Sequence, residues 1–346
     1  MLSSFSEKAI MTKVKAMYGR RITDAQYREL LHRRSVAEVA AYLRDETDYR
    51  DILLDTAPNA VHREQLENLL RKHRYMQYLK LLRYDSSQSD SYYQFPIVRA
   101  EAEQLLHMIQ LLNFGRADEY ITMYPAYLAH LTSFSLSELA RVRSFDELRT
   151  LLHGTPYGEV LAPHLPAGTQ QANLAHCETA LYRYFYARCD ELARTHYGKA
   201  TVRALTDIRG THMELMNVYL IYRMKKFFPD TTPEEICAMM LKSGRIPDKV
   251  MREWANAPDA DAFLQALYAS PYQRYIDAQD FVFIEYTGEC IRYHLNRRYL
   301  RFGDTAPVAF TSYMVLSELE LKNITTIIEG IRYSVPSDEI QKLLIV

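Results

Sequence analysis

The sequence predicts an all-α protein in which one helical unit is repeated three times. Three observations support this prediction. Apolar residues recur at helical spacing along most of the 346 residues. Alternating strand patterns bounded by Asn-Gly or Asp-Gly turns are missing from the sequence. A signature of three residue patterns also occurs three times in the same order, which is typical of duplicated supersecondary units.

The first part of the signature is a hydroxyl residue, any residue and then tyrosine. It occurs as Thr47-Asp48-Tyr49, Thr155-Pro156-Tyr157 and Ser270-Pro271-Tyr272. Proline disfavours the helical conformation of the residue before it, so this element should end a helix and redirect the chain. We expect the tyrosine ring to fill that corner, with its hydroxyl reaching a backbone group or water.

The second part is a glutamate followed eight positions later by a tyrosine. The pairs are Glu67 and Tyr75, Glu178 and Tyr186, and Glu285 and Tyr293. The two residues of a pair lie about two helical turns apart on one face, too far for direct contact. We expect each of these glutamates to lie on a solvated helix edge.

The third part is glutamate, two residues and then asparagine or glutamine. It occurs as Glu101 to Gln104, Glu214 to Asn217 and Glu320 to Asn323, each opening an apolar stretch. Two of these stretches have clear helical periodicity, and each helix is expected to follow its glutamate directly. The two polar side chains share one helix face, where they could hydrogen-bond a neighbouring helix end. An architectural role is therefore expected for them.

The spacing of the copies predicts how the chain is divided. Successive copies of the third part lie 113 and 106 residues apart. A chain of 346 residues exceeds the roughly 250 to 300 at which a single hydrophobic core stops growing. We therefore predict helical repeat units at residues 1–120, 121–230 and 231–346.

The sequence also indicates where several helices begin and end. Capping boxes, in which a hydroxyl and a carboxylate satisfy the free N–H groups of a helix start, occur at four places. They are Ser35 to Glu38, Ser135 to Glu138, Ser144 to Glu147 and Thr232 to Glu235. Prolines fall between periodic segments and glycine is scarce, with 11 residues, so long helices joined by short loops are expected. His196-Tyr197-Gly198 is typical of a helix end.

Composition excludes several classes of function. Lys and Arg, 42 in all, nearly balance 43 Asp and Glu, which gives no global electrostatic reason to bind nucleic acid or an anionic membrane. Four cysteines without a Cys-x-x-Cys pair favour reduced thiols in a cytosolic protein. No apolar run approaches the roughly 18 to 20 residues that span a bilayer, so a soluble, at most peripheral, protein is expected.

No catalytic, cofactor-binding or metal-binding residues are predicted. The standard motifs of metallohydrolases, phosphate-binding loops, acyl transferases and dinucleotide-binding proteins do not occur. His176-Cys177 with Cys189 matches the spacing of no zinc ribbon or finger. The runs Arg71 to Tyr75 and Arg297 to Arg301 could stack on RNA, but in a neutral chain they more often form a solvated helix face.

Three segments resemble a known family. They are Thr12-Lys13-Val14-Lys15-Ala16-Met17, the stretch Leu151-Leu152-His153-Gly154-Thr155-Pro156-Tyr157, and Glu214-x-x-Asn217-Val218-Tyr219-Leu220-Ile221-Tyr222-Arg223-Met224-Lys225. Together they are similar to the C subunit of archaeal and bacterial A/V-type rotary ATPases, whose eukaryotic V-ATPase counterpart is the d subunit. The resemblance covers nearly the whole chain. Gln104 in place of asparagine and Ser270 in place of threonine depart from the family's pattern and bear on one helix-end contact and one corner.

The resemblance implies a non-catalytic, funnel-shaped socket on the cytoplasmic side of the membrane. Such a socket would lie between the proteolipid ring and the D-type and F-type subunits of the rotor shaft. It would couple ATP hydrolysis or synthesis mechanically to proton or sodium transport. Three related units joined head to tail suit near-threefold closure around a central cavity.

Two alternatives stay open at this stage. The chain could be an α-helical scaffold of an unrelated assembly. It could also be an enzyme with an unrecognised site, which would require an interior pocket with converging charged side chains and a perturbed acid or base.

Overall fold

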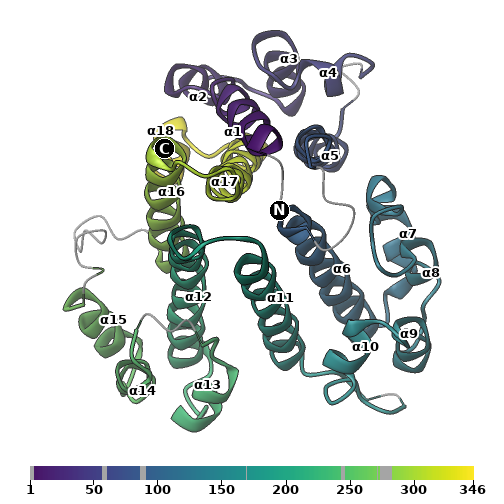
Figure 1. Cartoon of the computed structure of the whole chain (residues 1–346), viewed down its shortest axis with the longest axis vertical. Coiled ribbons are helices and arrows are strands. Elements are labelled where there is room, and N and C mark those ends of the chain that lie inside the picture. Colours follow the sequence, from purple (N-terminus) through teal and green to yellow (C-terminus); the bar gives the residue numbers. More distant parts are fainter. Residues whose placement is uncertain are drawn as a thin grey trace. The chain divides into compact units, whose positions relative to one another are not determined.

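The computed structural model describes residues 4–56, 61–85, 91–168, 170–242, 246–270, 272 and 283–346. Throughout these ranges the regular secondary structure is helical, from α1 to α18 (Figure 1), and no strand occurs in them. The all-α prediction is confirmed. Pro271, which belongs to the third predicted corner, lies outside the described residues.

Each copy of the signature begins with a pair of short helices. The pairs are α2 (Asp24–Leu31) with α3 (Val36–Glu46), α8 (Leu136–Leu139) with α9 (Phe145–Leu152), and α14 (Asp248–Ala255) with α15 (Ala260–Tyr268). We call residues 22–49 module 1, residues 133–157 module 2, and residues 246–270 with Tyr272 module 3. Every module ends at the tyrosine of the first signature element.

Each module is followed along the chain by two long helices. These are α5 (Arg63–Leu82) and α6 (Phe95–Asn113), α11 (Leu174–His196) and α12 (Lys199–Phe227), and α16 (Ile284–Phe302) and α17 (Ala306–Arg332). The glutamate of the second signature element lies near the start of the first long helix, and its tyrosine lies near the middle. The third lies inside the second long helix, so the expectation that the helix follows its glutamate is wrong for α6 and α17. Both helices have proline in their first turn, Pro96 and Pro307, which fixes an earlier start.

Shorter elements complete the fold. The remaining α-helices are α1 (Ser4–Tyr18), α4 (Arg50–Leu53), α7 (Tyr120–Met123), α10 (Pro156–Leu161), α13 (Pro233–Met239) and α18 (Ser337–Lys342). Three 3₁₀ turns are η2 (Tyr92–Gln94), η3 (Ala117–Glu119) and η4 (Ala126–Leu128).

All four predicted helix starts are confirmed, but of the four only Thr232 has the complete capping box, in which Glu235 also accepts the N–H of Thr232. The glutamates after Ser35 and Ser144 accept the N–H of Arg34 and Arg143 instead. The hydroxyls accept a hydrogen bond from the backbone N–H of the glutamate three residues on, at 3.2 or 3.3 Å, at Ser35, Ser135, Ser144 and Thr232. These residues are the N-caps of α3, α8, α9 and α13. The helix end at His196 is also confirmed, because α11 stops there and α12 begins at Lys199.

Contacts divide the chain into two compact units. Unit 1 comprises Met1–Ser89, Arg203–His212 and Leu264–Val346, and unit 2 comprises Asp90–Val202 and Met213–Phe263. Unit 1 therefore combines the two ends of the sequence. Its core is a cluster of buried residues that joins module 1 to α17, with members such as Leu30, Val39, Leu43, Ile324, Ile327 and Ile328.

The two units use the same helix pairing. In unit 2, α6 of the first copy packs on α11 of the second copy. In unit 1, α17 of the third copy packs on α5 of the first copy. In both cases the helix that carries the third element contacts the first long helix of the next copy. For the third copy, the next copy is the first. The described helices contain none that is both long and apolar enough to cross a membrane.

The contact between α17 and α18 generates a stability prediction. A Cβ on Gly330 would overlap Cγ1 and Cδ1 of Ile340, which is buried. Overpacking of this kind costs about 1 to 3 kcal/mol, more than the roughly 1 kcal/mol by which alanine favours a helix over glycine. Gly330→Ala should therefore lower the free energy of unfolding measured in urea. In an Ile340→Ala background the same change should raise it, and the same sign in both backgrounds would contradict the overlap.

Candidate functional site

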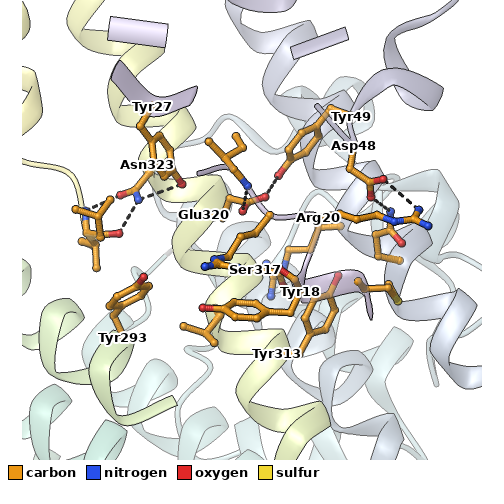
Figure 2. A pocket seen from close by; sticks show the side chains of 18 of the residues that line it. Tyr18, Arg20, Tyr27, Asp48, Tyr49, Tyr293, Tyr313, Ser317, Glu320 and Asn323 are labelled. Atoms are coloured by element: carbon orange, nitrogen blue, oxygen red, sulfur yellow. Dashed lines mark hydrogen bonds and ion pairs between the residues drawn. The ribbon is translucent and has the colours of Figure 1, made fainter. Parts of the chain in front are cut away.

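The candidate site is the carboxylate of the third signature element, which binds the two ends of a module. Glu320 on α17 shows the arrangement in unit 1 (Figure 2). Its Oε2 accepts the backbone N–H of Ile22 at 2.9 Å, and its Oε1 accepts the hydroxyl of Tyr49 at 2.9 Å. Ile22 begins module 1 and Tyr49 ends it, so one side chain holds both ends of the module.

The same arrangement recurs in unit 2. Glu101 on α6 is buried, and its two oxygens accept the backbone N–H of Ser133 and the hydroxyl of Tyr157, the latter at 2.7 Å. These residues begin and end module 2. Glu214 on α12 is also buried, and its Oε1 accepts the backbone N–H of Ile246, the first residue of module 3, at 3.1 Å.

The pairing runs from each copy to the next. The glutamate of copy 1 binds module 2, that of copy 2 binds the start of module 3, and that of copy 3 binds module 1. We expected the tyrosine hydroxyl to reach a backbone group or water. For Tyr49 and Tyr157 a carboxylate is the close partner instead, and Tyr157 reaches the Val98 carbonyl only at 3.3 Å.

The hydroxyl of the first element closes the corner before the tyrosine. It donates to a carbonyl near the end of the preceding helix at 2.5 to 2.7 Å, from Thr47 to Leu43, from Thr155 to Leu152 and from Ser270 to Leu267. It also accepts a backbone N–H from a residue two or three positions on. Ser270 makes the same two bonds as the threonines, so its departure from the pattern changes no corner contact. Tyr272, which follows it, is buried.

In the second and third copies, the asparagine of the third element binds the backbone N–H and carbonyl of one residue beyond a short helix. Asn217 donates to the carbonyl of Leu241 at 2.7 Å and accepts its N–H at 2.8 Å. Asn323 makes the same pair of bonds with Ile345, at 2.7 and 2.9 Å. In the first copy the structure differs, since the Oε1 of Gln104 accepts the hydroxyl of Tyr120 at 2.7 Å.

A cavity of about 130 Å³ lies beside the Glu320 link in unit 1. Figure 2 shows its lining, which includes the labelled Tyr18, Tyr293, Tyr313, Asp48 and Arg20. Asp48, the middle residue of Thr47-Asp48-Tyr49, accepts hydrogen bonds from Arg20 at 3.4 Å and from Gln77 at 3.3 Å. Polar side chains therefore line the cavity from α1, module 1, α5, α16 and α17.

Burial shifts the titration of three groups at this cavity. Glu320 faces the cavity, yet the surrounding protein withdraws it from bulk water and raises the pKa of its carboxyl. Burial and the Glu320 charge raise the pKa of Tyr49 well above its ordinary value, so this hydroxyl stays protonated and donates. Burial lowers the pKa of His73 to about 4, and the imidazole is neutral near pH 7.

These perturbed groups have structural partners. Both carboxylate oxygens of Glu320 accept hydrogen bonds, which leaves the group committed to module 1. His73 lies against the ring of Tyr49, with centroids 4.5 Å apart, and its Nε2 is 2.9 Å from the amide nitrogen of Gln77. A pocket with perturbed groups was the condition for the enzyme alternative. Here burial causes the pKa shifts of Glu320 and His73, and the hydrogen bonds of Glu320 give it a structural role. Within the described residues, no group of three His, Cys, Asp or Glu side chains is placed to hold a metal ion.

The second signature element has no common environment. Glu178 is exposed as expected, and Glu285 is half-buried. The expectation is wrong for Glu67, which is buried and accepts hydrogen bonds from Arg63 at 2.7 Å and Arg71 at 3.4 Å. Arginines one turn to either side on α5 neutralise this carboxylate, which permits its burial.

Two cations of the basic runs are likewise engaged within unit 1. Arg74 pairs with Glu318 at 3.4 Å, and Arg298 approaches Asp207 at 4.0 Å. Tyr299 donates its hydroxyl to the same Asp207 at 2.7 Å. These contacts favour the structural explanation of the runs.

The fold and the links between copies define an all-α protein of repeated helical modules. Residues 10–343 match the family described as ATP synthase (C/AC39) subunit, and the chain belongs to that family. It is an accessory subunit of an A/V-type ATP synthase, not the catalytic one. The resemblance inferred from the sequence is confirmed.

The chain is similar in sequence to curated relatives over most of their length. The chain is similar to the C subunit of the A-type ATP synthase of Methanosphaera stadtmanae, with 21% identity over 96% of this chain and 86% of the relative. It is equally similar, at 21%, to the corresponding protein of Desulfurococcus sp., over 96% of this chain and 88% of the relative. The corresponding protein of Methanocaldococcus jannaschii is 21% identical over 97% and 85%.

Tyrosine-to-phenylalanine substitutions should show whether a hydroxyl that binds a carboxylate contributes more to stability than a buried hydroxyl without a hydrogen bond. Tyr49→Phe removes the hydroxyl donor from Oε1 of Glu320, a carboxylate withdrawn from bulk water, and should lower the free energy of unfolding by about 1 to 3 kcal/mol. Tyr78 is the matched control, because among the described residues its buried hydroxyl has no hydrogen-bond partner. Tyr78→Phe should be neutral or stabilising in the same urea titration. Equal losses in the two variants would contradict the proposed importance of the link.

His73 should make stability depend on pH. Its folded pKa of about 4 lies below the ordinary 6.5, so the unfolded chain binds more protons between these values. The contribution is complete above pH 6.5 and is lost as the pH falls towards 4, by about 3 kcal/mol in all. His73→Gln should flatten the plot of unfolding free energy against pH in this window. A slope unchanged from wild type would refute the assignment.

Proposed function

We propose that this chain is the central-rotor subunit of an A/V-type ATP synthase or ATPase, a socket that couples the rotor shaft to the membrane proteolipid ring. Its partners would be the D-type and F-type shaft subunits on one side and the ring on the other, at the cytoplasmic face of the membrane. Membership of the family, and relatives named as the C subunit of A-type ATP synthases, support a place in this complex.

The observation that carries the proposal is the link from the last copy back to the first. Glu320 of the third copy binds both ends of module 1. Related units joined head to tail form either an open array or a closed one, and an open array leaves its last unit without a following partner. The return link supports closure. We therefore propose three units, near residues 1–120, 121–230 and 231–346, arranged with near-threefold symmetry as a funnel around a central cavity.

Torque transmission requires joints that do not slip. Glu320 and Glu101 each fasten a module at two points, its first backbone N–H and its last tyrosine. Two attachment points on one carboxylate fix the orientation of a module, whereas a single hydrogen bond would let it pivot. Asn217 and Asn323 each add a pair of hydrogen bonds to the backbone N–H and carbonyl of one residue beyond a short helix.

A pulldown from detergent-solubilised membranes tests the proposal. The tagged full-length chain, expressed in cells that contain the ATPase, should recover D-type, F-type and proteolipid subunits in fixed proportions. The untagged chain in the same cells is the control. Reproducible recovery of other proteins without shaft or proteolipid subunits would instead support an unrelated helical scaffold, and the socket would be rejected.

A further inference from the structure

The cavity beside the Glu320 link is lined by phenols whose hydroxyls the protein itself does not use. Tyr18, Tyr293 and Tyr313 come from α1, α16 and α17, and Figure 2 shows their rings below Glu320. The Tyr18 hydroxyl is buried, and none of the three hydroxyls has a hydrogen-bond partner among the described residues. Tyr313 is only 8% exposed. Buried hydroxyls normally have partners, so the cavity offers donors for a bound molecule.

Four arginines also line this cavity, and two of them are bound to carboxylates. The four are Arg20, Arg21, Arg74 and Arg297. Arg20 pairs with Asp48, and Arg74 pairs with Glu318, each at 3.4 Å. In the part of the chain that the structure describes, Arg21 and Arg297 form no ion pair. The lining therefore contains two guanidinium groups whose charge is not neutralised by a neighbouring carboxylate.

Tyrosine rings of the lining hold these two guanidinium groups. Arg21 lies 4.4 Å from the ring centroid of Tyr18 and donates to the Tyr18 carbonyl at 3.3 Å. Arg297 lies 5.8 Å from the ring centroid of Tyr293. Burial raises the pKa of Tyr18, while the charges of both arginines oppose that shift, so both cations act on one phenol. A guanidinium that lies over a ring keeps N–H groups at its edge for a planar fork to an oxyanion.

Three carboxylates line the same cavity, and two of them are already bound. Asp48 is paired with Arg20, and both oxygens of Glu320 accept hydrogen bonds from module 1. Asp24 is exposed in the first turn of α2, where the helix N-terminus favours an acidic side chain. An anion in the cavity would therefore meet two unpaired guanidinium groups, whereas a cation would meet only the exposed Asp24 as an unpaired charge of opposite sign.

We propose that this cavity binds a small tetrahedral oxyanion, either inorganic phosphate or a small phosphate monoester, through Arg21, Arg297 and Tyr313. Its volume of about 130 Å³ is several times the roughly 10 to 15 Å³ that one water molecule needs, so a polyatomic ion fits. Guanidinium groups match the geometry of phosphate oxygens. The inference goes beyond the socket and does not require it, because all residues of the site belong to unit 1.

The positions of the donors favour phosphate over a carboxylate. Arg21 follows α1, Arg297 lies on α16 and Tyr313 lies on α17, so the donors come from three separate elements. A tetrahedral anion has oxygens in four directions and can accept from all three elements at once. A planar carboxylate has two oxygens and would leave part of this donor set unused.

Isothermal titration calorimetry tests the site with the purified full-length chain and sodium phosphate, in a buffer that contains no other oxyanion. Wild type should bind phosphate saturably with one site per chain. The double variant Arg21→Gln with Arg297→Gln should raise the dissociation constant at least roughly tenfold, because it removes two charged donors. Tyr313→Phe, which removes one neutral donor, should raise it by a smaller factor.

Arg301→Gln is the matched control. Arg301 lies one turn after Arg297 on α16 and is 5.3 Å from the ring centroid of Phe302, but it does not line the cavity. This variant should bind phosphate as wild type does. Since Arg21, Arg297 and Arg301 are all exposed, the helical circular dichroism of the arginine variants should match wild type.

Two further titrations identify the source of the phosphate group. Methyl phosphate that binds as tightly as inorganic phosphate supports a monoester as the ligand, and much weaker binding of methyl phosphate supports the free ion. Sodium acetate that binds more tightly than phosphate would overturn the tetrahedral assignment. No saturable binding at millimolar phosphate, an equal response to sodium chloride at the same ionic strength, or an equal loss in Arg301→Gln would refute the site. The pulldown result has no bearing on these outcomes.

Discussion

The fold depends on carboxylates that have been removed from bulk water and given donors from another part of the sequence. Burying an ionised group is costly unless hydrogen bonds replace its hydration. Glu101 and Glu320 meet this demand with a backbone N–H and a tyrosine hydroxyl from the two ends of one module. The carboxylates in turn accept the N–H at the start of a module and supply the closest acceptor of a buried tyrosine hydroxyl. The same hydrogen bonds thus fasten the modules and replace the hydration of the carboxylates.

This constraint explains how such short helices persist. Helix α8 has four residues and α2 and α14 have eight each, well below the length at which isolated helices are stable in water. Caps at Thr23 and Ser135 satisfy part of the backbone, but most of the stability must come from tertiary contacts. In module 1, the cluster shared with α17 provides the apolar contacts, and Glu320 fixes where the module begins and ends.

The sequence predicted the helical class, four capped helix starts and the glutamates, tyrosines and asparagines of the links, because these depend on local spacing. It did not predict their backbone partners, such as Ile22 and Ser133. It did not find the pairing between copies, since Tyr157 and Glu101 are 56 residues apart and Tyr49 and Glu320 are 271 apart. One sequence signal was available. The first-element tyrosine of the next copy follows the third-element glutamate by nearly the same interval after Glu101 and Glu214, and only Tyr49 has no third-element glutamate before it. The burial of Glu67 was missed because its two arginine partners are typical of a solvated face as well.

The return link also dictates the order in which the molecule can be completed during synthesis. Module 1 emerges from the ribosome first, yet its apolar partners on α17 and the carboxylate that fastens it are translated nearly last. At about 5 to 20 residues per second, the intervening stretch takes on the order of tens of seconds. Unit 2 is nearly continuous in sequence, so it can fold before the partners of module 1 on α17 have been synthesised. The earliest residues of this chain are therefore among the last to reach their native state.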